Sequence, residues 1–375
     1  MKKILFMIHD LGQGGAEKVL VNLVNNMNHN EFDITVMSLF GGGVNEQFLK
    51  KEIKYQTVFS KSFPGNSHLM KLYTPEQLHS FFVKEKYDIE VSYLEGPCAR
   101  IISGCPYKET KLVSWIHVEQ RTKECAAGAF RNYRESAACY KRFDKIVCVS
   151  ESVKDDFMNL YPEIQDAVVL YNTNETDQIL KLKDEAVEDG IFKAGEIRLC
   201  GVGKIMPNKG FDKLARIHKR LRDDGYPVHT YILGKGPERK KIEQYLSENQ
   251  LEDSFTFLGY QTNPYKYMAR CNVFVCTSIA EGFSTAATEA LIVGVPVVTT
   301  PVAGMKEMLG EKNEYGVIVE NSEDTIYKTL KSLIKDKKLL YEYKEKARFR
   351  GQDFSKENTV KAVEASLNLI VGELV

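Results

Sequence analysis

The sequence of 375 residues is 43% hydrophobic and carries 51 basic and 51 acidic side chains. This length exceeds what one ordinary core accommodates and predicts two α/β domains. A formal charge of zero gives no overall electrostatic basis for binding nucleic acid or a strongly acidic partner, so we expect no nucleic-acid partner.

In the first half, short apolar runs alternate with longer amphipathic ones, which is the pattern of a parallel sheet covered by helices. The predicted strands are residues 3–8, 33–39, 88–94, 111–116, 145–150 and 167–171. Between the first two strands, five apolar residues share one helical face: Val19, Leu20, Leu23, Val24 and Met27. These segments predict an N-terminal domain over residues 1–171.

A second, similar series follows a connecting region. Residues 172–196 are polar and acidic, with one weak helical pattern, and indicate a connection between domains. Further strands are predicted at residues 197–203, 228–234, 254–259, 272–278, 295–300 and 315–320. Helical patterns then cover residues 324–336, 338–350 and 355–373. The series predicts a second doubly wound domain over residues 172–354.

Residues 281–290, EGFSTAATEA, follow a predicted strand and place two glutamates eight positions apart. In doubly wound sheets, ligands bind beyond the carboxyl ends of strands, where loops lead into helices. Ser284 or Thr285 is expected to cap the next helix, whose first-turn N–H groups suit a phosphate. Glu281 and Glu289 would then bond hydroxyl groups, such as those of a nucleotide sugar. Without a second motif, two solvated surface glutamates explain the segment as well.

The second motif is GVGKIMPNKG, residues 201–210. Gly201 and Gly203 allow a ligand to approach the backbone, while Lys204 and Lys209 place two ammonium groups beside a turn. Two cations over a diphosphate stabilise the bound donor and the nucleoside diphosphate that leaves. A plain turn after a strand is the alternative, since neither the NTPase phosphate loop nor the dinucleotide pattern GxGxxG is present.

The first half has two comparable features. Gly14 and Gly15 begin the segment GGAEK and suit a loop whose amides face a ligand, with Glu17 at the start of a helix. His117 ends the predicted strand of residues 111–116. A helix cap without a ligand and a structural histidine are the respective alternatives.

Residues 121–145 carry seven basic and three acidic side chains interleaved with aromatic ones. At helical spacing Phe130, Tyr133, Ala137 and Tyr140 share a face, which we expect to pack on the N-terminal domain. The alternative is contact of the basic side with anionic lipid.

The cysteines and the apolar runs indicate the compartment. The eight cysteines form no CxxC pair, and no histidine cluster has metal-ligand spacing, so we expect buried thiols in a reducing cytoplasm. The apolar run before His9 is too short for a signal peptide, and no run approaches the roughly 20 apolar residues of a membrane span. We therefore expect a cytoplasmic protein that at most attaches to the inner membrane face.

Together, these motifs resemble those of glycosyltransferase family 4, retaining enzymes of the GT-B architecture. The resemblance covers nearly the whole chain and rests on GGAEK, SWIH, VSESVKDDF, GVGKIMPNKG, LGKGPER and residues 281–309. The last block is the most specific, because it looks like the family's E-x7-E signature. The resemblance implies two Rossmann-like domains facing across a cleft. The acceptor would bind mainly to the first and the nucleotide sugar mainly to the second, with the last helix, residues 355–375, packing back on the first domain.

The resemblance also implies roles for particular residues. Glu289 would bond the ribose hydroxyls, and Glu281 would lie against the sugar and phosphate. The implied catalytic residues are His117, Lys204, Lys209 and Glu281. The implied nucleotide-sugar contacts are Gly14, Gly15, Gly203, Gly282, Phe283, Ser284, Thr285 and Glu289. The family more often has arginine at the position of Lys204, and lysine lacks its bidentate geometry.

The function that the resemblance implies is transfer of a hexosyl unit from a UDP-sugar, carrying glucose, galactose or N-acetylglucosamine. The acceptor would be a saccharide or lipid-linked saccharide in surface polysaccharide or glycoconjugate synthesis. No cofactor, divalent metal or protein nucleophile is expected, because the leaving phosphate itself would assist deprotonation of the acceptor. The alternatives are a non-catalytic nucleotide-sugar-binding subunit that partners an active transferase, and another GT-B enzyme such as a nucleotide-sugar epimerase or a phosphorylase.

Overall fold

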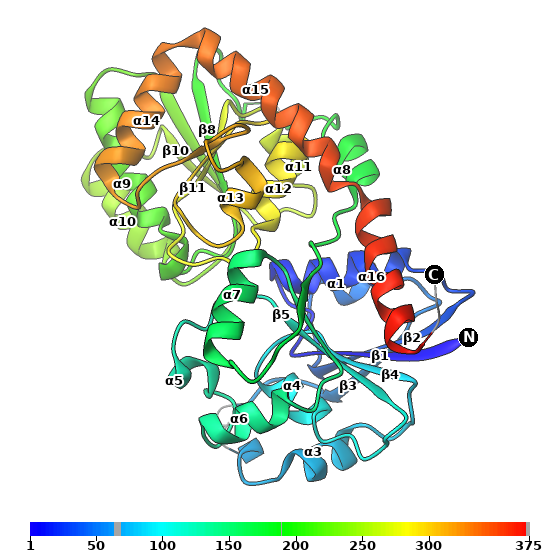
Figure 1. Ribbon diagram of the computed structural model, residues 1–375. Helices are drawn as coiled ribbons and strands as arrows, with labels where there is room; N and C mark the ends of the chain where they lie inside the picture. The colour runs from blue at the N-terminus through cyan, green and yellow to red at the C-terminus, as the bar shows by residue number, and fades with distance from the viewer. Residues whose placement is uncertain (64–68, 189, 373–375) are drawn as a thin grey trace. The chain divides into compact units, whose positions relative to one another are not determined.

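The computed structural model describes residues 1–63, 69–188 and 190–372 (Figure 1). Two compact units are present: Met1–Thr173 with Glu357–Val375, and Asn174–Lys356. Within the described residues, the first unit contains a seven-stranded sheet and the second a six-stranded sheet, and their neighbouring strands pair in parallel. The predicted fold class of two doubly wound α/β domains is therefore confirmed. Residues 373–375 of the predicted last helix lie outside the described residues.

The sheet of the first unit has the strand order β3-β2-β1-β4-β5-β6-β7. The strands are β1 (Lys2–Ile8), β2 (Phe32–Phe40), β3 (Lys54–Phe59), β4 (Ile89–Ser92), β5 (Lys111–Ile116), β6 (Lys145–Cys148) and β7 (Ala167–Val169). Ile4 of β1 pairs with Ile34 on one side and with Ile89 on the other. The central strands are buried on both faces, which explains their nearly continuous apolar sequences. The strand order reverses between β1 and β4.

Helices connect these strands. They are α1 (Gly15–Asn26), η1 (Glu46–Phe48), α3 (Pro75–Phe82), α4 (Pro97–Ile102), α5 (Lys123–Ala126), α6 (Tyr133–Tyr140) and α7 (Glu151–Leu160). The last helix, α16 (Lys356–Ile370), contacts the start of β1 and the segment that follows α1. Its Asn368 accepts a hydrogen bond from the Lys2 ammonium at 2.8 Å, and its Glu364 accepts one from the Asn28 N–H at 2.6 Å.

The sheet of the second unit has the order β10-β9-β8-β11-β12-β13, so its strand order reverses between β8 and β11. Its strands are β8 (Ile197–Val202), β9 (Val228–Leu233), β10 (Phe255–Gly259), β11 (Val273–Cys276), β12 (Val297–Thr299) and β13 (Val317–Ile318). The helices are α8 (Thr176–Leu182), η2 (Pro207–Lys209), α9 (Phe211–Asp223), α10 (Arg239–Glu248), α11 (Tyr265–Met268), α12 (Thr285–Ile292), α13 (Met305–Leu309), α14 (Glu323–Lys335), α15 (Lys337–Gly351) and η3 (Gln352–Phe354).

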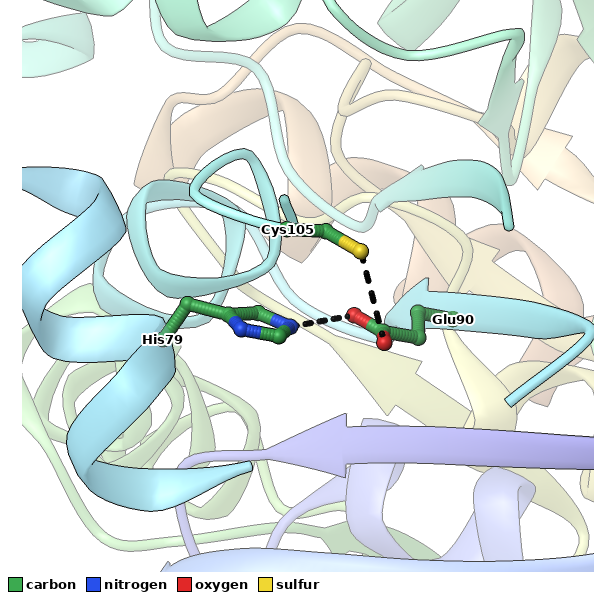
Figure 2. Close-up of side chains that lie close together, drawn as sticks. All are labelled: His79, Glu90 and Cys105. Atoms are coloured by element: carbon green, nitrogen blue, oxygen red, sulfur yellow. Dashed lines mark hydrogen bonds and ion pairs between the residues drawn. The ribbon is translucent and has the colours of Figure 1, made fainter. Parts of the chain in front are cut away.

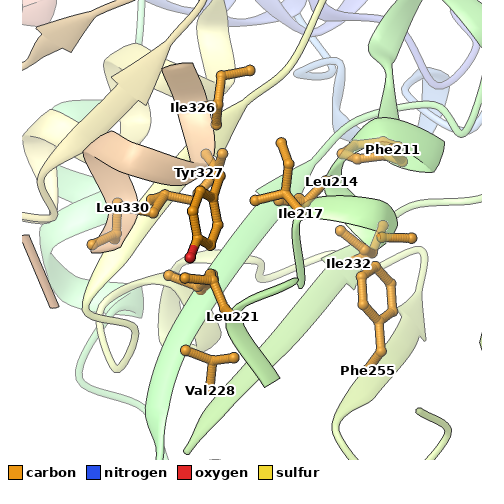
Figure 3. Close-up of a cluster of buried hydrophobic side chains, with 14 of the residues drawn as sticks. Phe211, Leu214, Ile217, Leu221, Val228, Ile232, Phe255, Ile326, Tyr327 and Leu330 are labelled. Carbon is orange, nitrogen blue, oxygen red and sulfur yellow. The ribbon is translucent and has the colours of Figure 1, made fainter. Parts of the chain in front are cut away.

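One face of this second sheet is covered by α9 and α14. The apolar residues of α9 recur at helical spacing, as Phe211, Leu214, Ile217 and Leu221 (Figure 3). They pack with residues of the sheet and of α14, among them Ile232. This core anchors the carboxyl end of β8 and therefore the loop that follows it.

Candidate functional site

Two loops of the second unit follow neighbouring strands at the point where the strand order reverses. β8 leads into residues 203–210 and β11 into residues 277–284, and the two strands are paired. Ligands of open α/β sheets bind beyond the carboxyl ends of the strands at such a point. Both sequence motifs of the second half therefore lie where this fold places a ligand.

Lys209 and Glu281 form an ion pair between these loops. Lys209 ends η2, and its Nζ lies 2.5 Å from Oε1 of Glu281. The Ser278 hydroxyl donates a hydrogen bond to the same carboxylate oxygen at 2.7 Å. The Lys209 and Glu281 side chains are only 24% and 12% exposed, so solvent screens this pair less than a surface pair. The lysine ammonium is therefore held beside the loop that leads into α12.

Thr277 fixes the backbone that carries Lys209. Its hydroxyl lies 3.0 Å from the Lys209 carbonyl oxygen and 2.8 Å from the Gly210 carbonyl oxygen, which both accept its hydrogen bond. Gly210 has φ of +65°, and a Cβ on it would lie 2.4 Å from the Thr277 carbonyl oxygen. Glycine is required here because the left-handed backbone and the close contact coincide. Thr277 and Gly210 therefore join the two loops.

Helix α12 begins after Ser284, whose side chain accepts a hydrogen bond from the first helical turn. Ser284 is thus the cap, and Thr285 is the first helical residue. Glu289 lies one turn into α12, as predicted, but is only 3% exposed. Its Oε1 accepts a hydrogen bond from the buried Tyr265 hydroxyl at 3.1 Å. Glu289 is therefore not a solvated surface residue.

Gly282 and Phe283 lie directly before the cap and are both buried. They pack against Gly304, where a Cβ would come within 2.7 Å of the Phe283 ring and 2.9 Å of the Gly282 carbonyl oxygen. This packing holds the loop against the start of α13. The first N–H groups of a helix have no carbonyl partner within it and carry a partial positive charge, so the loop borders a place suited to an anion.

Gly203 and Lys204 directly follow β8. Gly203 has φ of +151°, and a Cβ on Gly234 would lie 1.9 Å from the Gly203 carbonyl oxygen. This contact brings the LGKGPER segment, residues 233–239, against the loop after β8. Lys204 is exposed. Gly201 is buried within β8 beneath the Phe211 ring and does not line the loop.

In the first unit, the loop after β1 leads into α1 at the corresponding reversal of strand order. Gly14 is the N-cap and Gly15 the first helical residue. A Cβ on Gly14 would lie 1.7 Å from Oε2 of Glu17, so this carboxylate lies over the start of α1. Asn45 braces the loop, because its side-chain amide donates to the Gly12 carbonyl.

His117 directly follows β5 and is buried, at 7% exposure. Its backbone N–H donates to Oε2 of Glu95 at 2.9 Å. Burial lowers the pKa of the imidazole to about 3, with a hydrogen bond to the Tyr93 backbone acting in the opposite direction. Nε2 has no hydrogen-bond partner among the described residues. Because the other ring nitrogen carries the proton that bonds Tyr93, Nε2 presents a lone pair.

Glu95 follows β4, the strand beside β1 and β5. Burial raises the pKa of its carboxyl group, and the hydrogen bond from the His117 backbone lowers it by less. In the first unit the structure thus places the Glu95 carboxylate at the His117 backbone, a contact that sequence reasoning missed.

The aromatic residues of segment 121–145 face the interior of the first unit. Phe130, Tyr140 and Phe143 are buried, and the Tyr140 ring packs against Phe157 at a centroid distance of 5.1 Å. Two of the arginines hold backbone carbonyls: Arg131 bonds those of Lys71 and Leu72, and Arg142 those of Ser103 and Cys105. The predicted packing of the aromatic face is therefore confirmed.

Sequence reasoning missed Thr277, Ser278, Glu95 and Asn45. Thr277, Ser278 and Glu95 are polar residues that follow a buried strand at the end where ligands bind, and this signal was available in the sequence. Asn45 lies 30 or more residues from the loop that it braces, so no local pattern indicates it.

Two family descriptions match the chain. Residues 183–350 match Glycosyl transferases group 1, and residues 13–178 match Glycosyltransferase Family 4. The chain is 27% identical over 395 aligned residues to the Campylobacter jejuni N-acetylgalactosamine-N,N'-diacetylbacillosaminyl-diphospho-undecaprenol 4-alpha-N-acetylgalactosaminyltransferase, covering 99% of this chain and 100% of that protein. It is 24% identical over 302 residues to the lipopolysaccharide core biosynthesis glycosyltransferase LpsD of Rhizobium meliloti, covering 79% of this chain and 78% of that protein.

The crystal structure of Anabaena HepE in complex with UDP and glucose has the same fold. Its TM-score is 0.78 at 19% identity, covering 98% of this chain and 100% of HepE. In the part of the present chain that the structure describes, no helix has the length and apolar character that a membrane crossing requires.

Proposed function

The chain belongs to the glycosyltransferases, with a first half of the Glycosyltransferase Family 4 type and a second half of the group 1 type, and from this membership we propose its reaction. The enzyme moves a hexosyl unit from a UDP-sugar to a saccharide or lipid-linked saccharide and retains the anomeric configuration. The product enters surface polysaccharide or glycoconjugate synthesis. UDP as the nucleotide is supported by the HepE complex, and a lipid-linked acceptor by the name of the Campylobacter relative.

The observation that carries this proposal is the Lys209–Glu281 ion pair beside the start of α12. A diphosphate placed there meets the Lys209 ammonium on one side and the helix N-terminus on the other. Negative charge on the diphosphate increases as the glycosidic bond breaks, so both groups stabilise the transition state more than the bound donor. Lys204 adds a second cation from the same loop, and with this charge present the donor needs no divalent metal.

The remaining site residues hold the donor. Glu289 bonds the ribose hydroxyls, with Tyr265 fixing its carboxylate. The loop residues Gly282, Phe283, Ser284 and Thr285 place their backbone against the sugar and phosphate, as does Gly203. Glu281 contacts the sugar.

In the first unit, Gly14 and Gly15 offer backbone to the donor, and His117 accepts a hydrogen bond from a sugar hydroxyl through Nε2. The neutral imidazole suits this role because a protonated ring has no acceptor atom. Retention follows when the acceptor attacks the face that the diphosphate leaves, with a leaving phosphate oxygen taking the acceptor proton.

We also propose that the protein works at the cytoplasmic membrane face, with basic residues of segment 121–145 facing anionic lipid. Arg134 and Lys141 carry this contact, because both are exposed and, unlike Arg131 and Arg142, donate to no backbone carbonyl of the described residues. Each basic residue near an anionic surface contributes about 1 kcal/mol.

The test is a thermal-shift series with UDP-, GDP- and ADP-sugars, followed by product analysis with the stabilising donor. We expect stabilisation by UDP-glucose, UDP-galactose or UDP-N-acetylglucosamine, unchanged by a chelator, and release of UDP with transfer to an acceptor. Binding without hydrolysis or transfer would identify a non-catalytic subunit, and conversion to another nucleotide sugar an epimerase. Stabilisation by a GDP-sugar alone would refute the choice of nucleotide.

A further inference from the structure

Three side chains able to bind a metal converge in the first unit, outside the loops described above. His79 lies on α3, Glu90 on β4, and Cys105 in the turn after α4. Figure 2 shows the imidazole and the sulfur pointing at the two oxygens of one carboxylate. Nε2 of His79 lies 2.9 Å from Oε2, and Sγ of Cys105 lies 3.6 Å from Oε1. One ligand atom from each residue lies within 4.8 Å of the others.

The cluster is closed to solvent, with His79 2% exposed and Glu90 and Cys105 fully buried. Among the described residues, no lysine or arginine pairs with the Glu90 carboxylate, whose contacts are His79 and Cys105. A buried carboxylate costs several kcal/mol unless it is compensated. The compensation must therefore come from within the cluster.

Surrounding contacts fix the positions of the three residues. Gly104 packs so closely on the start of α3 that a Cβ there would lie 2.0 Å from the Pro75 carbonyl oxygen. The Arg142 guanidinium donates to the Cys105 carbonyl at 2.8 Å. Glu90 lies in the sheet, where it pairs with Leu5 and Leu112. The sulfur, imidazole and carboxylate are thus held together by packing that does not depend on their own hydrogen bonds.

We propose that His79, Glu90 and Cys105 bind one divalent transition-metal ion, for which zinc is the best fit. Zinc bonds sulfur at about 2.3 Å and nitrogen or oxygen at about 2.0–2.2 Å, so ligand atoms from different residues lie about 3.3–3.7 Å apart around a tetrahedral ion. The ligand atoms of the cluster lie within 4.8 Å of one another, so side-chain shifts of about 1 Å or less bring them to these distances. The carboxylate supplies both oxygens, which makes four donor atoms with the nitrogen and the sulfur.

Charge and ligand chemistry agree with this choice. A dication with one carboxylate, one thiolate and one neutral imidazole sums to zero, which suits an interior without other partners for Glu90. A mixed set of nitrogen, sulfur and oxygen ligands favours zinc over calcium or magnesium. Binding replaces the thiol proton of Cys105, which passes to solvent. The ion would fasten α3 and the turn after α4 to the sheet.

The experiment is refolding of the full chain under reducing conditions with cobalt(II) or zinc, because a closed site takes up its ion most readily as the chain folds. We expect one equivalent of zinc per chain and, with cobalt, a thiolate-to-metal charge-transfer band. Cys105→Ser should abolish the band, and Glu90→Gln or His79→Gln should weaken binding by more than about a hundredfold. Cys148→Ser changes another buried thiol of this unit and should keep both signals.

A wild-type chain that binds no more zinc than Cys105→Ser, or a cobalt form without the charge-transfer band, would overturn the proposal. His79 and Glu90 would then be a buried hydrogen-bonded pair. The metal readout is independent of sugar transfer, so its failure leaves the proposed function untouched.

Discussion

Lys209 is positioned from two directions, by the carboxylate of Glu281 and by the hydroxyl of Thr277 under its carbonyl. These two contacts preorganise the Lys209 ammonium, because it need not be ordered when the donor binds. The two contacts act on different parts of the residue, and they lead to separate predictions.

Replacing the ammonium should affect the reaction more than donor binding. For Lys209→Ala we expect kcat to fall by about ten- to hundredfold, since a hydrogen bond to a charged group contributes about 1.5–3 kcal/mol. Glu289→Ala is the comparison: the ribose contact is the same before and during the reaction, so its loss should raise KM and leave kcat nearly unchanged. Steady-state kinetics with the best UDP-sugar measures both. Equal effects of the two substitutions on KM alone would contradict these roles.

The hydroxyl of Thr277 should act through Lys209. Thr277→Val keeps the shape and loses the hydrogen bond to the two carbonyls, at a cost of about 1 kcal/mol. We expect UDP to bind several-fold more weakly while uridine, which lacks the diphosphate, binds as before. Thr277→Ser should restore UDP binding because it retains the hydroxyl. Isothermal titration of UDP and uridine gives this comparison, and a parallel loss for both ligands would mean that Thr277 only stabilises the fold.

The site was predictable from the sequence where its residues lie in one short segment. Glu281, Ser284 and Glu289 follow a single strand, so their order along the chain specifies their places in the loop and on α12. The Lys209–Glu281 pair was not predictable, because its partners are 72 positions apart and meet through the strand order. The same holds for the cluster of His79, Glu90 and Cys105.

At the scale of elements, the apolar strands were predictable, including the edge strands β7, β10 and β13, and the polar edge strand β3 was not. The predicted strands correspond to β1, β2 and β4 to β13. β3 was missed because its sequence, KYQTVF, is largely polar and none of its residues is buried. Pairing with β2 sets the position of β3, and the local sequence pattern of β3 does not indicate that pairing.

Helix α9 provides a prediction for the pH dependence of stability. His218 on its buried face bonds the hydroxyls of Thr230 and Ser254, both at 2.9 Å. Burial lowers its pKa from 6.5 to about 3. Below pH 6.5 the unfolded chain binds a proton that the folded chain does not, so stability present at neutral pH is lost as the pH falls toward 3. The slope is about 1.4 kcal/mol per pH unit.

His218→Gln removes this titration while keeping a donor and an acceptor. We expect the variant to be less stable than the wild type at pH 7. Between pH 6 and 4, its free energy of unfolding should fall less steeply than that of the wild type, by about 1.4 kcal/mol per pH unit. Urea unfolding at several pH values measures the two slopes. The same slope in both proteins would show that His218 is protonated in the folded state.

At the scale of the whole molecule, attachment to a membrane surface should depend on charge rather than on apolar insertion, because Phe130, Tyr140 and Phe143 of segment 121–145 are buried. We expect the protein to sediment with anionic liposomes at low salt and to be released at high salt. Arg134→Gln with Lys141→Gln should reduce the bound fraction at low salt. Lys241→Gln with Lys328→Gln, two exposed lysines of the second unit, is the control. If the wild-type protein does not sediment with liposomes at low salt, the acceptor is a soluble molecule rather than a lipid-linked one.

The first unit is built from two separate parts of the chain, because residues 1–173 precede the second unit and α16 follows it. α16 bonds Lys2 of β1 and Asn28, which lies after α1. On the ribosome, the strands of the first unit therefore emerge long before their last helix. The second unit can reach its native state before Lys2 and Asn28 form their hydrogen bonds with α16. The first unit is completed only when translation has passed residue 370, so its final stability is acquired last, although its sheet is synthesised first.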